Sequence, residues 1–585
     1  MRRWIPLILV VAAVAVYANS FRVPFLYDDN NAIVDNRHVR RLWPIWYAAS
    51  APTQSTVAGR PVVSLTLALN YAVSGLNVWS YHAFNLILHL VNALLLFGIA
   101  RRTLEHTGRT ANDAVGLALA IALVWTVHPL LTESVTYVVQ RTELLMSFFL
   151  LLTLYCVIRG WQLAAVLACA LGMGCKEVMV VAPLLVLLYD RAFLPGTFAG
   201  ALRQRTALYA ALAATWIVFA AWGAPGPRSE TVGLRFAELT PWRYALTECG
   251  VIVHYLRLSA WPYPLVIDYD DWPIARSVRD VWPAALVVGG LAVATIWAMW
   301  RSPKLGFVGA SFLLILAPTS SFVPIVTEVV AERRMYLPLA AVITLVMIAA
   351  SRLTRSRPNG ARLLLVGTVI VGFGLMTVAR NHDYRSELAI WNDAVNQRPH
   401  NVRALVNLGT VLAKLGQADE AIARYERALE VDPNSPDAHF NLGVTLAGQN
   451  KLEAAQVHLV RAVGLVPQSA AAQYSLGVVL AQRGDLVAAA ARLAESLRLS
   501  SRNAEAHNAF GSVLARQDNL ADAEREFNEA VRLRPDYADA HANLGFALAQ
   551  QGKRDEAIRQ WEAALQLDPQ SERVRHALAN ATAIR

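Results

Sequence analysis

Long apolar runs separated by short polar connections fill the first two thirds of this chain and predict a bundle of membrane helices. A run of about 17 to 25 apolar residues is long enough to cross a bilayer. The first run, Ile5–Ser20, follows a basic start, Met1-Arg2-Arg3, which predicts a cytoplasmic N-terminus. A cleavable signal peptide is the alternative for this segment, because Val16-Tyr17-Ala18 resembles a cleavage site. The pattern predicts eleven spans, at residues 5–20, 81–100, 114–128, 143–158, 161–175, 178–190, 207–222, 281–300, 305–321, 336–351 and 363–379.

A twelfth apolar window, residues 244–261, is interrupted by three ionisable side chains, so we predict an interfacial helix there. With eleven crossings, the basic clusters between spans all fall on the cytoplasmic side, as the positive-inside rule expects. These clusters are Arg101-Arg102, Arg203/Arg205, Arg301/Lys304 and Arg352/Arg355/Arg357/Arg362. Two long connections, residues 21–80 and 223–280, then lie on the outer side, together with everything after residue 380. Connections of this length are usually functional.

Composition and charge support a membrane protein over a nucleic-acid-binding one. Of the 585 residues, 55% are hydrophobic and only 16% are charged. The net charge of +10 is unevenly distributed: residues 1–379 carry 30 Lys and Arg against 18 Asp and Glu, whereas the remainder carries 23 against 25. No compact basic stripe with interleaved aromatics is present in the sequence. The four cysteines all lie in the apolar half without metal-ligand spacing, so we expect neither a disulfide framework nor a cysteine metal site.

The stretch Phe25–Asn36 places two adjacent carboxylates, Asp28 and Asp29, a few residues beyond the first span. Ionisable groups so close to hydrocarbon are costly and usually functional. We therefore predict that one of them is the catalytic base of a membrane-embedded sugar transferase. The alternative is an ordinary turn, because Asp and Asn are turn-forming residues.

Polar side chains also recur inside the predicted bundle. His82, Asn85, His89 and Asn92 lie at intervals of three and four, which places them on one face of a helix. They either form interhelical hydrogen bonds or line an active-site cavity. A second group lies at the outer ends of the spans, where Arg and Lys could hold a phosphate and the alternative is a set of membrane-edge ion pairs. This group contains Glu133, Arg141, Glu143, Lys176, Glu177, Glu332, Arg333 and Tyr336.

From residue 399 onward the chain has a 34-residue repeat. Pro399, Pro433, Pro467, Pro535 and Pro569 keep this period, and so do five glycines and five alanines. Such a period is the signature of tetratricopeptide repeats, with two helices in each unit. We predict a connecting helix at 381–399, five repeats at 400–569, and a capping helix and tail at 570–585.

Arms of this kind usually bind extended peptides on their concave face. Asn407, Asn441 and Asn543 share one repeat position, and an amide there could hydrogen-bond the backbone of an acceptor peptide. The alternative is that these are repeat-consensus residues without a ligand.

Taken together, the motifs resemble the transmembrane and tetratricopeptide repeat-containing protein O-mannosyltransferases, a group within the GT-C superfamily of membrane glycosyltransferases. The resemblance is carried by YDD after the first span, Arg60-Pro61, YHxxNxxxHxxNA, HPxxTE followed by RxELL, CKE, and AERxxYLP before a repeat array. It covers nearly the whole chain. Two positions depart from the common pattern of the family, Leu131 and Gln140.

The resemblance implies a polyprenyl-phosphate sugar donor, often carrying mannose, and a Ser or Thr acceptor on a translocated protein. It implies that Asp28 or Asp29 is the base and that the donor site includes Arg141, Glu143, Lys176, Glu177, Glu332, Arg333 and Tyr336. We add Arg60, His82, His89 and Glu133 to the expected donor site. No cofactor is required beyond the lipid-linked donor, and a divalent metal is possible but not indicated.

The sequence thus predicts an all-α protein, with a GT-C-like membrane domain at residues 1–380 followed by the repeat arm. Its predicted function is inverting transfer of a sugar from the lipid donor to an extracytoplasmic protein that the arm holds. A non-catalytic scaffold for envelope assembly and an O-oligosaccharide ligase are the alternatives. Because the loops are short and no retention signal is seen, we predict the bacterial inner membrane, with the arm in the periplasm.

Overall fold

The structure is a computed structural model, and it describes residues 4–52, 55–194, 197–222, 239–325, 328–354, 356 and 358–583. Within these ranges all regular elements are helices, with no β-strand. The chain divides into two compact units, Met1–Asn401 and Val402–Arg585. The all-helical fold class expected from the sequence is therefore confirmed. Part of the predicted second outer loop, residues 223–238, and the basic residues Arg2, Arg3, Arg355 and Arg357 lie outside the described ranges.

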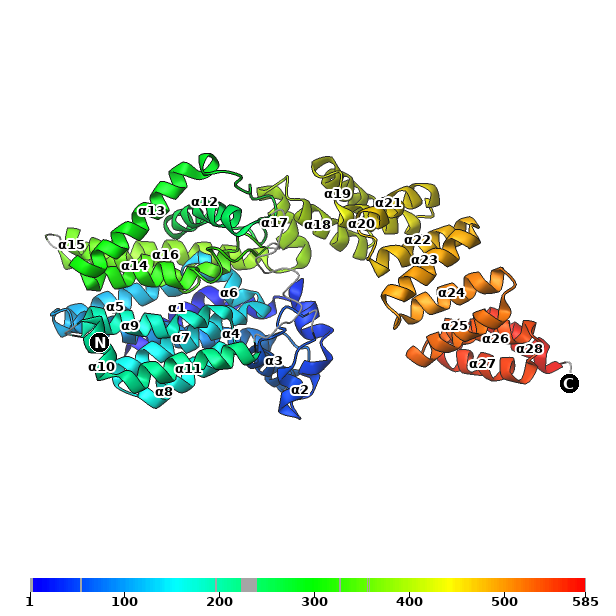
Figure 1. Ribbon diagram of the computed structural model, residues 1–585, viewed down its shortest axis with the longest axis horizontal. Coiled ribbons are helices and arrows are strands. Elements are labelled where there is room, and N and C mark those ends of the chain that lie inside the picture. Colours follow the sequence, from blue (N-terminus) through cyan, green and yellow to red (C-terminus); the bar gives the residue numbers. More distant parts are fainter. Residues whose placement is uncertain are drawn as a thin grey trace. The chain divides into compact units, whose positions relative to one another are not determined.

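The first unit is built from long helices and from short ones in the connections (Figure 1). The longer helices are α1 (Ile5–Tyr17), α3 (Pro61–Ser74), α4 (Trp79–Glu105), α5 (Ala111–Thr126), α7 (Arg141–Arg159), α8 (Gln162–Met173), α9 (Ala182–Phe193), α11 (Thr206–Trp222), α12 (Pro241–Ala260), α13 (Val278–Arg301), α14 (Pro303–Leu316), α15 (Pro338–Leu353), α16 (Asn359–Asp383) and α17 (Glu387–Gln397). The short ones are α2 (Ile45–Ala49), α6 (Thr132–Thr136) and α10 (Phe198–Gln204).

Each of the eleven predicted spans falls on a helix, but fewer helices are long enough to cross a membrane by themselves. In the described part of the chain, five helices are long and apolar enough by length and composition, and two bent helix pairs would raise the number to seven. Helices of this length and composition fit an integral membrane protein. The windows 161–175, 207–222, 305–321 and 336–351 fall on apolar helices of only 12 to 17 residues. At 1.5 Å per residue, a helix of 12 residues covers about 18 Å of a hydrocarbon core about 30 Å thick.

Helix α4 lies at the centre of the first unit, in contact with α1, α5 and α7. Its polar stripe is buried together with its apolar residues, and His82, Asn85, His89 and Asn92 are at most 1% exposed. In contrast, α13 and α16 bury little of their surface within the chain. Their exposed residues are mostly apolar, as expected for helices that face lipid. The four cysteines are all free.

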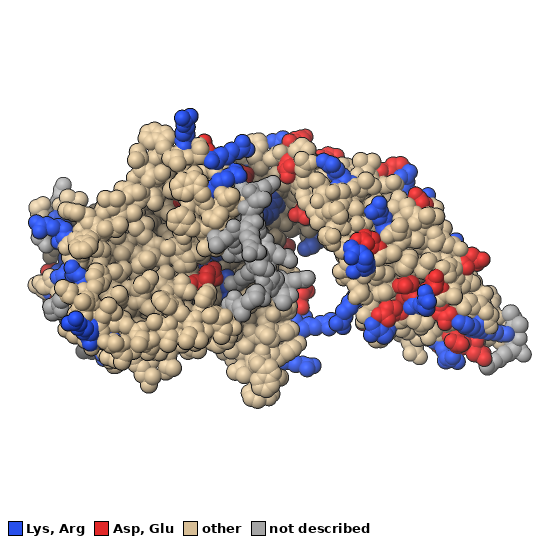
Figure 2. Space-filling view, in the orientation of Figure 1, with Lys and Arg blue, Asp and Glu red and all other residues tan. Residues whose placement is uncertain are grey.

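The second unit consists of five helix pairs and a last helix. The pairs are α18 (Val402–Lys414) with α19 (Ala418–Val431), α20 (Pro436–Gly448) with α21 (Leu452–Leu465), α22 (Ala470–Arg483) with α23 (Leu486–Leu499), α24 (Ala504–Arg516) with α25 (Leu520–Leu533), and α26 (Ala538–Gln550) with α27 (Arg554–Leu567), and α28 (Glu572–Ala583) follows. On the face shown in Figure 2, charged side chains of both signs gather over this unit and are sparse over the first.

The repeated glycines explain the close packing within each pair. A Cβ atom on Gly443 would lie 2.7 Å from Cγ of Leu459 and 3.2 Å from the carbonyl oxygen of Ala455. Equivalent contacts occur at Gly409, Gly477, Gly511 and Gly545. The repeat therefore requires glycine at this position so that the two helices of a pair can touch.

Replacing Gly443 by alanine is accordingly expected to destabilise the arm by about 1–3 kcal/mol, because overpacking at a tight contact forces neighbouring groups to move. The control is Gly448→Ala in the same helix, where an added Cβ meets nothing within 4 Å. That change should leave stability unchanged or slightly raise it, since alanine restricts the unfolded chain more than glycine does. Calorimetry of the purified chain would compare the two variants. Equal effects of both substitutions would contradict the packing argument.

Candidate active site

The loop after α1 is held to the rest of the unit through its own backbone and through Asp29. The Asp29 carboxylate is fully buried, with Oδ1 accepting a hydrogen bond from the backbone N–H of Val139 (2.7 Å) and Oδ2 accepting one from that of Leu26 (3.0 Å). The backbone N–H of Asp28 donates to the hydroxyl of Tyr137 (2.9 Å). Asp29 therefore ties the loop to the segment that precedes α7.

The residue before Asp28 has an unusual backbone conformation. Tyr27 has a φ of 35°, which a residue with a Cβ seldom adopts, and its N–H donates to Oε1 of Glu387 at the start of α17 (2.8 Å). Such conformations persist only where surrounding contacts hold them, and they cluster at functional sites. The strained turn presents the side chain of Asp28 in a defined direction.

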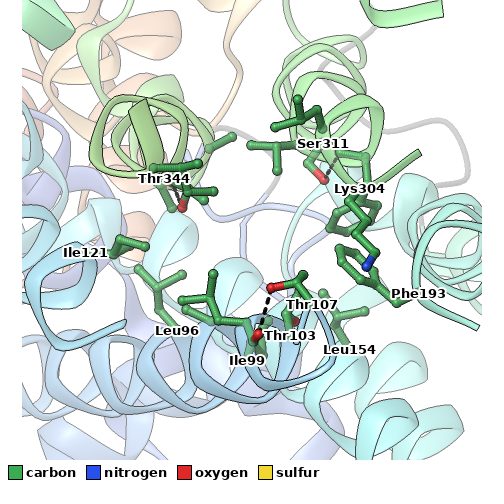
Figure 3. Close-up of a pocket in the computed structure, with 18 of the residues that line it drawn as sticks. Leu96, Ile99, Thr103, Thr107, Ile121, Leu154, Phe193, Lys304, Ser311 and Thr344 are labelled. Atoms are coloured by element: carbon green, nitrogen blue, oxygen red, sulfur yellow. Dashed lines mark hydrogen bonds between the residues drawn. The ribbon is translucent and has the colours of Figure 1, made fainter. Parts of the chain in front are cut away.

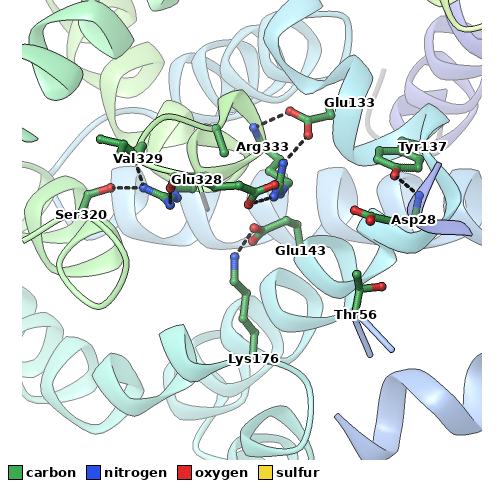
Figure 4. Close-up of polar contacts among 12 residues, drawn as sticks. Asp28, Thr56, Glu133, Tyr137, Glu143, Lys176, Ser320, Glu328, Val329 and Arg333 are labelled. Atoms are coloured by element: carbon green, nitrogen blue, oxygen red, sulfur yellow. Dashed lines mark hydrogen bonds and ion pairs between the residues drawn. The ribbon is translucent and has the colours of Figure 1, made fainter. Parts of the chain in front are cut away.

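The two aspartates therefore differ in environment although they are neighbours in sequence. Asp28 is only partly buried, and its side chain extends toward the ion pairs drawn in Figure 4. Asp29 is enclosed, and burial raises its pKa to about 8, while its two backbone hydrogen bonds act in the opposite direction. Both oxygens of Asp29 accept hydrogen bonds from backbone N–H groups, and Asp28 is the more exposed of the two carboxylates.

Arg333 pairs with two acidic residues, and Figure 4 draws this group together with Asp28. Its Nη1 pairs with Oε1 of Glu133 (2.7 Å), and its backbone N–H donates to Oε2 of the same carboxylate (3.0 Å). Nη2 pairs with Glu328. The Arg333 side chain keeps 13% of its surface exposed. The guanidinium group is thus held in place by its partners, and the side chain is still partly exposed.

A second ion pair joins α7 to the segment after α8. Lys176 pairs with Glu143, and both side chains are at least nine-tenths buried. Glu177, the residue after Lys176, lies 3.8 Å from Arg60, and both of these side chains are partly exposed. In Figure 4 the Lys176–Glu143 pair is drawn below the Arg333 group, with Asp28 to one side of both. The region therefore combines a carboxylate with several cations, as transfer from a phosphate-linked donor requires.

Arg141, by contrast, is completely buried in the protein. Its Nε donates to Oδ1 of Asn85 (3.1 Å), Nη1 to Oδ1 of Asn70 (2.6 Å) and Nη2 to the carbonyl of Tyr81 (3.2 Å). The guanidinium also stacks over the ring of Phe84, 4.7 Å from its centroid. All three nitrogen atoms have protein partners, so the contacts of Arg141 hold α3, α4 and α7 together and offer no direct contact with a donor.

Other predicted donor-site residues also have protein partners. His89 donates from Nε2 to the carbonyl of Thr126 (3.0 Å), so its Nδ1 accepts from the hydroxyl of Tyr336 (2.8 Å). Asn92 donates to that same hydroxyl (3.2 Å). His82 donates from Nε2 to the carbonyl of Val23 (2.8 Å). The polar stripe of α4 therefore makes interhelical hydrogen bonds, one of the two roles expected from its spacing.

Glu332 anchors the long connection that follows α12. Its Oε1 accepts hydrogen bonds from the backbone N–H of Val266 (2.6 Å) and the hydroxyl of Tyr269 (2.5 Å). Burial raises the pKa of this carboxyl to about 8. Like Arg141, Glu332 bonds to other protein groups and so holds neighbouring segments together.

Sequence reasoning overlooked several residues of this region. Tyr137, Glu328 and Glu387 carry the contacts of the aspartate loop and of Arg333, yet no local motif marks them. It also missed Arg334, which is buried 3.5 Å from Glu248 of α12. Glu248 is one of the three ionisable side chains that interrupt the apolar window 244–261, and such a residue is itself a signal of a buried partner.

The three predicted peptide-binding asparagines differ from one another. Nδ2 of Asn407 is buried and has no hydrogen-bond partner among the described residues. Nδ2 of Asn441 donates within its own helix to the carbonyl of Asp437 (2.9 Å). Asn543 donates to Oδ1 of Asn508 (3.0 Å) and accepts from Arg573 (3.2 Å). Their role in binding an acceptor stays a prediction. Across the described ranges, no group of three or more His, Cys, Asp or Glu residues could hold a metal ion.

The fold and this region define an integral membrane protein with a tetratricopeptide arm. Family models described as TPR repeat match residues 409–450 and 516–552, and models described as tetratricopeptide repeat match 445–504 and 538–571. The arm also matches a solved structure titled "Crystal structure of YrrB: a TPR protein with an unusual peptide-binding site", with 24% identity over 32% of this chain and 96% of that one and a TM-score of 0.29.

Comparison with curated proteins identifies relatives that match about 72% of the chain. It is 27% identical to "Protein O-mannosyl-transferase TMTC4" of Mus musculus over 72% of this chain and 66% of that protein. It is 27% identical to "Protein O-mannosyl-transferase TMTC1" of Homo sapiens, over 72% and 54%, and 24% identical to "Protein O-mannosyl-transferase F38B6.6" of Caenorhabditis elegans, over 73% and 62%. The chain spans between about half and two thirds of the length of these relatives. The resemblance to the O-mannosyltransferases with tetratricopeptide repeats is thereby confirmed.

Proposed function

We propose that this chain is a membrane glycosyltransferase that moves a sugar from a polyprenyl-phosphate donor to a Ser or Thr hydroxyl of an extracytoplasmic protein. The observation that carries the proposal is the arrangement around Asp28, where a partly exposed carboxylate extends toward ion-paired cations. The names of its relatives support the same class of activity and favour mannose as the sugar.

The reaction needs a base and a site for the leaving phosphate. The acceptor hydroxyl oxygen attacks the anomeric carbon while its proton passes to the base. The bond from that carbon to the phosphate oxygen breaks, and the electron pair leaves with the polyprenyl phosphate. Attack opposite to the leaving group inverts the anomeric configuration. The charge that grows on the phosphate requires cations held in place before the reaction.

We assign the base to Asp28 and a positioning role to Asp29. Asp29 already uses both carboxylate oxygens on backbone N–H groups, whereas Asp28 is partly exposed beside the ion pairs. A base must be able to reach the proton that it takes. The strained backbone at Tyr27 and the hydrogen bond from Asp28 to Tyr137 support a fixed orientation for this carboxylate.

We assign the donor phosphate to Lys176, Arg333 and Arg60. These three cations keep some exposed surface: the exposed fractions of their side chains are 9%, 13% and 17%, respectively. Each is paired with glutamate, which holds it in position in the absence of donor. We assign positioning roles to the residues whose polar atoms bond to protein groups: Arg141, His89, Glu332 and Tyr336. His82 joins them through Nε2, which bonds to Val23, although its buried Nδ1 has no hydrogen-bond partner among the described residues.

The arm supplies the acceptor protein in this proposal. Tetratricopeptide arrays bind extended peptides on their concave face, which suits an enzyme that must reach hydroxyls on a polypeptide. We place the site and the arm on the outer side of the membrane, because the positive-inside rule puts the opposite helix ends in the cytoplasm. The bacterial inner membrane stays a prediction from the sequence, since the three relatives compared are animal proteins.

Intact-mass analysis of proteins from the outer compartment tests the proposed activity. Cells with the wild-type gene are compared with cells that lack it and with cells in which it is restored. We expect a hexose-sized increment that disappears on deletion and returns on restoration. A larger glycan increment would indicate an oligosaccharide ligase. An envelope phenotype without any mass difference would contradict the transferase and favour a scaffold.

A further inference from the structure

An apolar cavity of about 490 Å³ lies within the first unit, between α4, α5, α7, α9, α14 and α15. Figure 3 shows its aliphatic and aromatic lining, which includes Leu96, Ile121, Leu154 and Phe193. A cavity of this size and character can hold a small apolar molecule or one chain of a larger one. None of the predicted site residues lines it.

Three cations lie at one end of this cavity. All three belong to the cavity lining: Arg109 follows α4, Lys304 is the second residue of α14, and Arg352 is the last but one of α15. In the described part of the chain none of them forms an ion pair, and Arg109 donates only to the hydroxyl of Ser351 (3.2 Å). Lys304 and Arg352 are exposed and Arg109 is partly buried. The lining of the cavity therefore carries three positive charges that no carboxylate of the described residues pairs with.

This end of the cavity lies far from the proposed transferase site along the same helices. In α7, Glu143 belongs to the site and Leu154 to the cavity, a separation of eleven residues or about 16 Å of helix. Tyr336, just before α15, hydrogen-bonds to His89 of α4. Arg352 lies sixteen residues later, near the other end of α15. The positive-inside rule places the cationic ends of these helices at the cytoplasmic surface.

We propose that this cavity binds one anionic phospholipid of the cytoplasmic leaflet, with an acyl chain inside and its phosphate at Arg109, Lys304 and Arg352. Charge complementarity favours this occupant, because anionic lipids are attracted to basic residues at the cytoplasmic surface and basic pockets between helices bind their headgroups. The donor lipid is disfavoured, since its phosphate belongs with the cations at the opposite helix ends. The inference rests on the proposed orientation and not on the transferase chemistry.

Native mass spectrometry of the full-length protein tests the inference. The protein is reconstituted with dioleoyl phosphatidylglycerol and dioleoyl phosphatidylcholine in equal amounts, so that the acyl chains match and only the headgroups differ. We expect the wild type to retain one phosphatidylglycerol molecule per chain under conditions that remove phosphatidylcholine. Equal retention of the two lipids would overturn the proposal.

Two sets of variants locate the bound lipid. The triple variant Arg109→Gln, Lys304→Gln, Arg352→Gln should lower phosphatidylglycerol retention at least tenfold. Its matched control is Arg159→Gln, Arg203→Gln, Arg301→Gln, which removes the same charge from the same predicted side at residues outside the cavity, and this variant should behave as the wild type. Equal losses in both triple variants would contradict a specific site.

A cavity-filling variant separates the acyl chain from the headgroup. Thr344 faces the cavity in Figure 3, and Thr344→Phe should exclude the lipid while leaving the three cations in place. If a copurifying polyprenyl phosphate is lost from this variant but retained by the triple variant, the cavity holds the donor tail and the proposal is wrong. Because every readout is a bound mass, these outcomes do not depend on whether the chain transfers sugar.

Discussion

Replacing Asp28 by asparagine is expected to slow sugar transfer by about 10²- to 10⁴-fold, the usual contribution of a positioned base. The amide keeps the shape of the side chain but is not basic enough to take the hydroxyl proton. Because Asp28 is partly exposed and its own N–H still bonds to Tyr137, stability should change by less than about 0.5 kcal/mol. Single-turnover kinetics on a purified donor and an acceptor peptide would measure the rate.

Asp29→Asn is the matched control. We expect it to lower stability while leaving the transfer rate largely unchanged. An asparagine has one acceptor oxygen, so its amide nitrogen would face the backbone N–H of either Leu26 or Val139. Leaving a buried donor unpaired costs about 1–3 kcal/mol of stability. Folded Asp29→Asn protein should keep most of its transfer rate. If Asp29→Asn abolishes transfer in a fully folded protein while Asp28→Asn does not, the two roles must be exchanged.

Replacing Lys176 by methionine is expected to destabilise the protein by about 3–5 kcal/mol, because Glu143 is left as a buried charge without a partner. The double variant Lys176→Met, Glu143→Gln removes that charge and should recover most of the lost stability. Thermal unfolding in detergent would follow both variants. Comparing the two variants shows how much of the stability change comes from the unpaired charge of Glu143.

The transfer rate of the same variants tests whether Lys176 also binds the donor phosphate. If it does, the double variant is stable but slow, by about 10²- to 10³-fold, since a cation at the leaving group is missing. Glu143→Gln alone should be much less affected, because Lys176 keeps its charge. A double variant that regains both stability and rate would show that the pair is only structural and would remove Lys176 from the donor site.

Much of the architecture could be predicted from local sequence because it depends on local patterns. The 34-residue spacing of glycines and alanines predicts paired helices, and the structure shows why glycine is needed: a Cβ on Gly443 would meet Leu459. Apolar runs likewise locate the helices of the first unit. The lengths of these helices were harder to predict from sequence, because a bend such as the 57° break between α5 and the following segment depends on tertiary contacts.

The candidate site shows the limit of motifs more clearly. The sequence marks Asp28 and Asp29 as a pair and marks Arg141 and Arg333 as equivalent cations. Only packing separates them: Asp29 turns inward to two backbone N–H groups, and Arg141 bonds to Asn70, Asn85 and Tyr81. A side chain that holds a loop and one that faces substrate can be identical in type and adjacent in sequence.

The sequence by itself determined the helical class, the repeat arm and the set of ionisable residues near the ends of the apolar helices, because periodicity and hydropathy are properties of neighbouring residues. The tertiary structure alone decided which of those residues are buried, which stay accessible, and that Arg109, Lys304 and Arg352 line one cavity. These three lie up to 243 positions apart along the chain. Their proximity, like the partners of each buried charge, follows from long-range packing that no local pattern encodes.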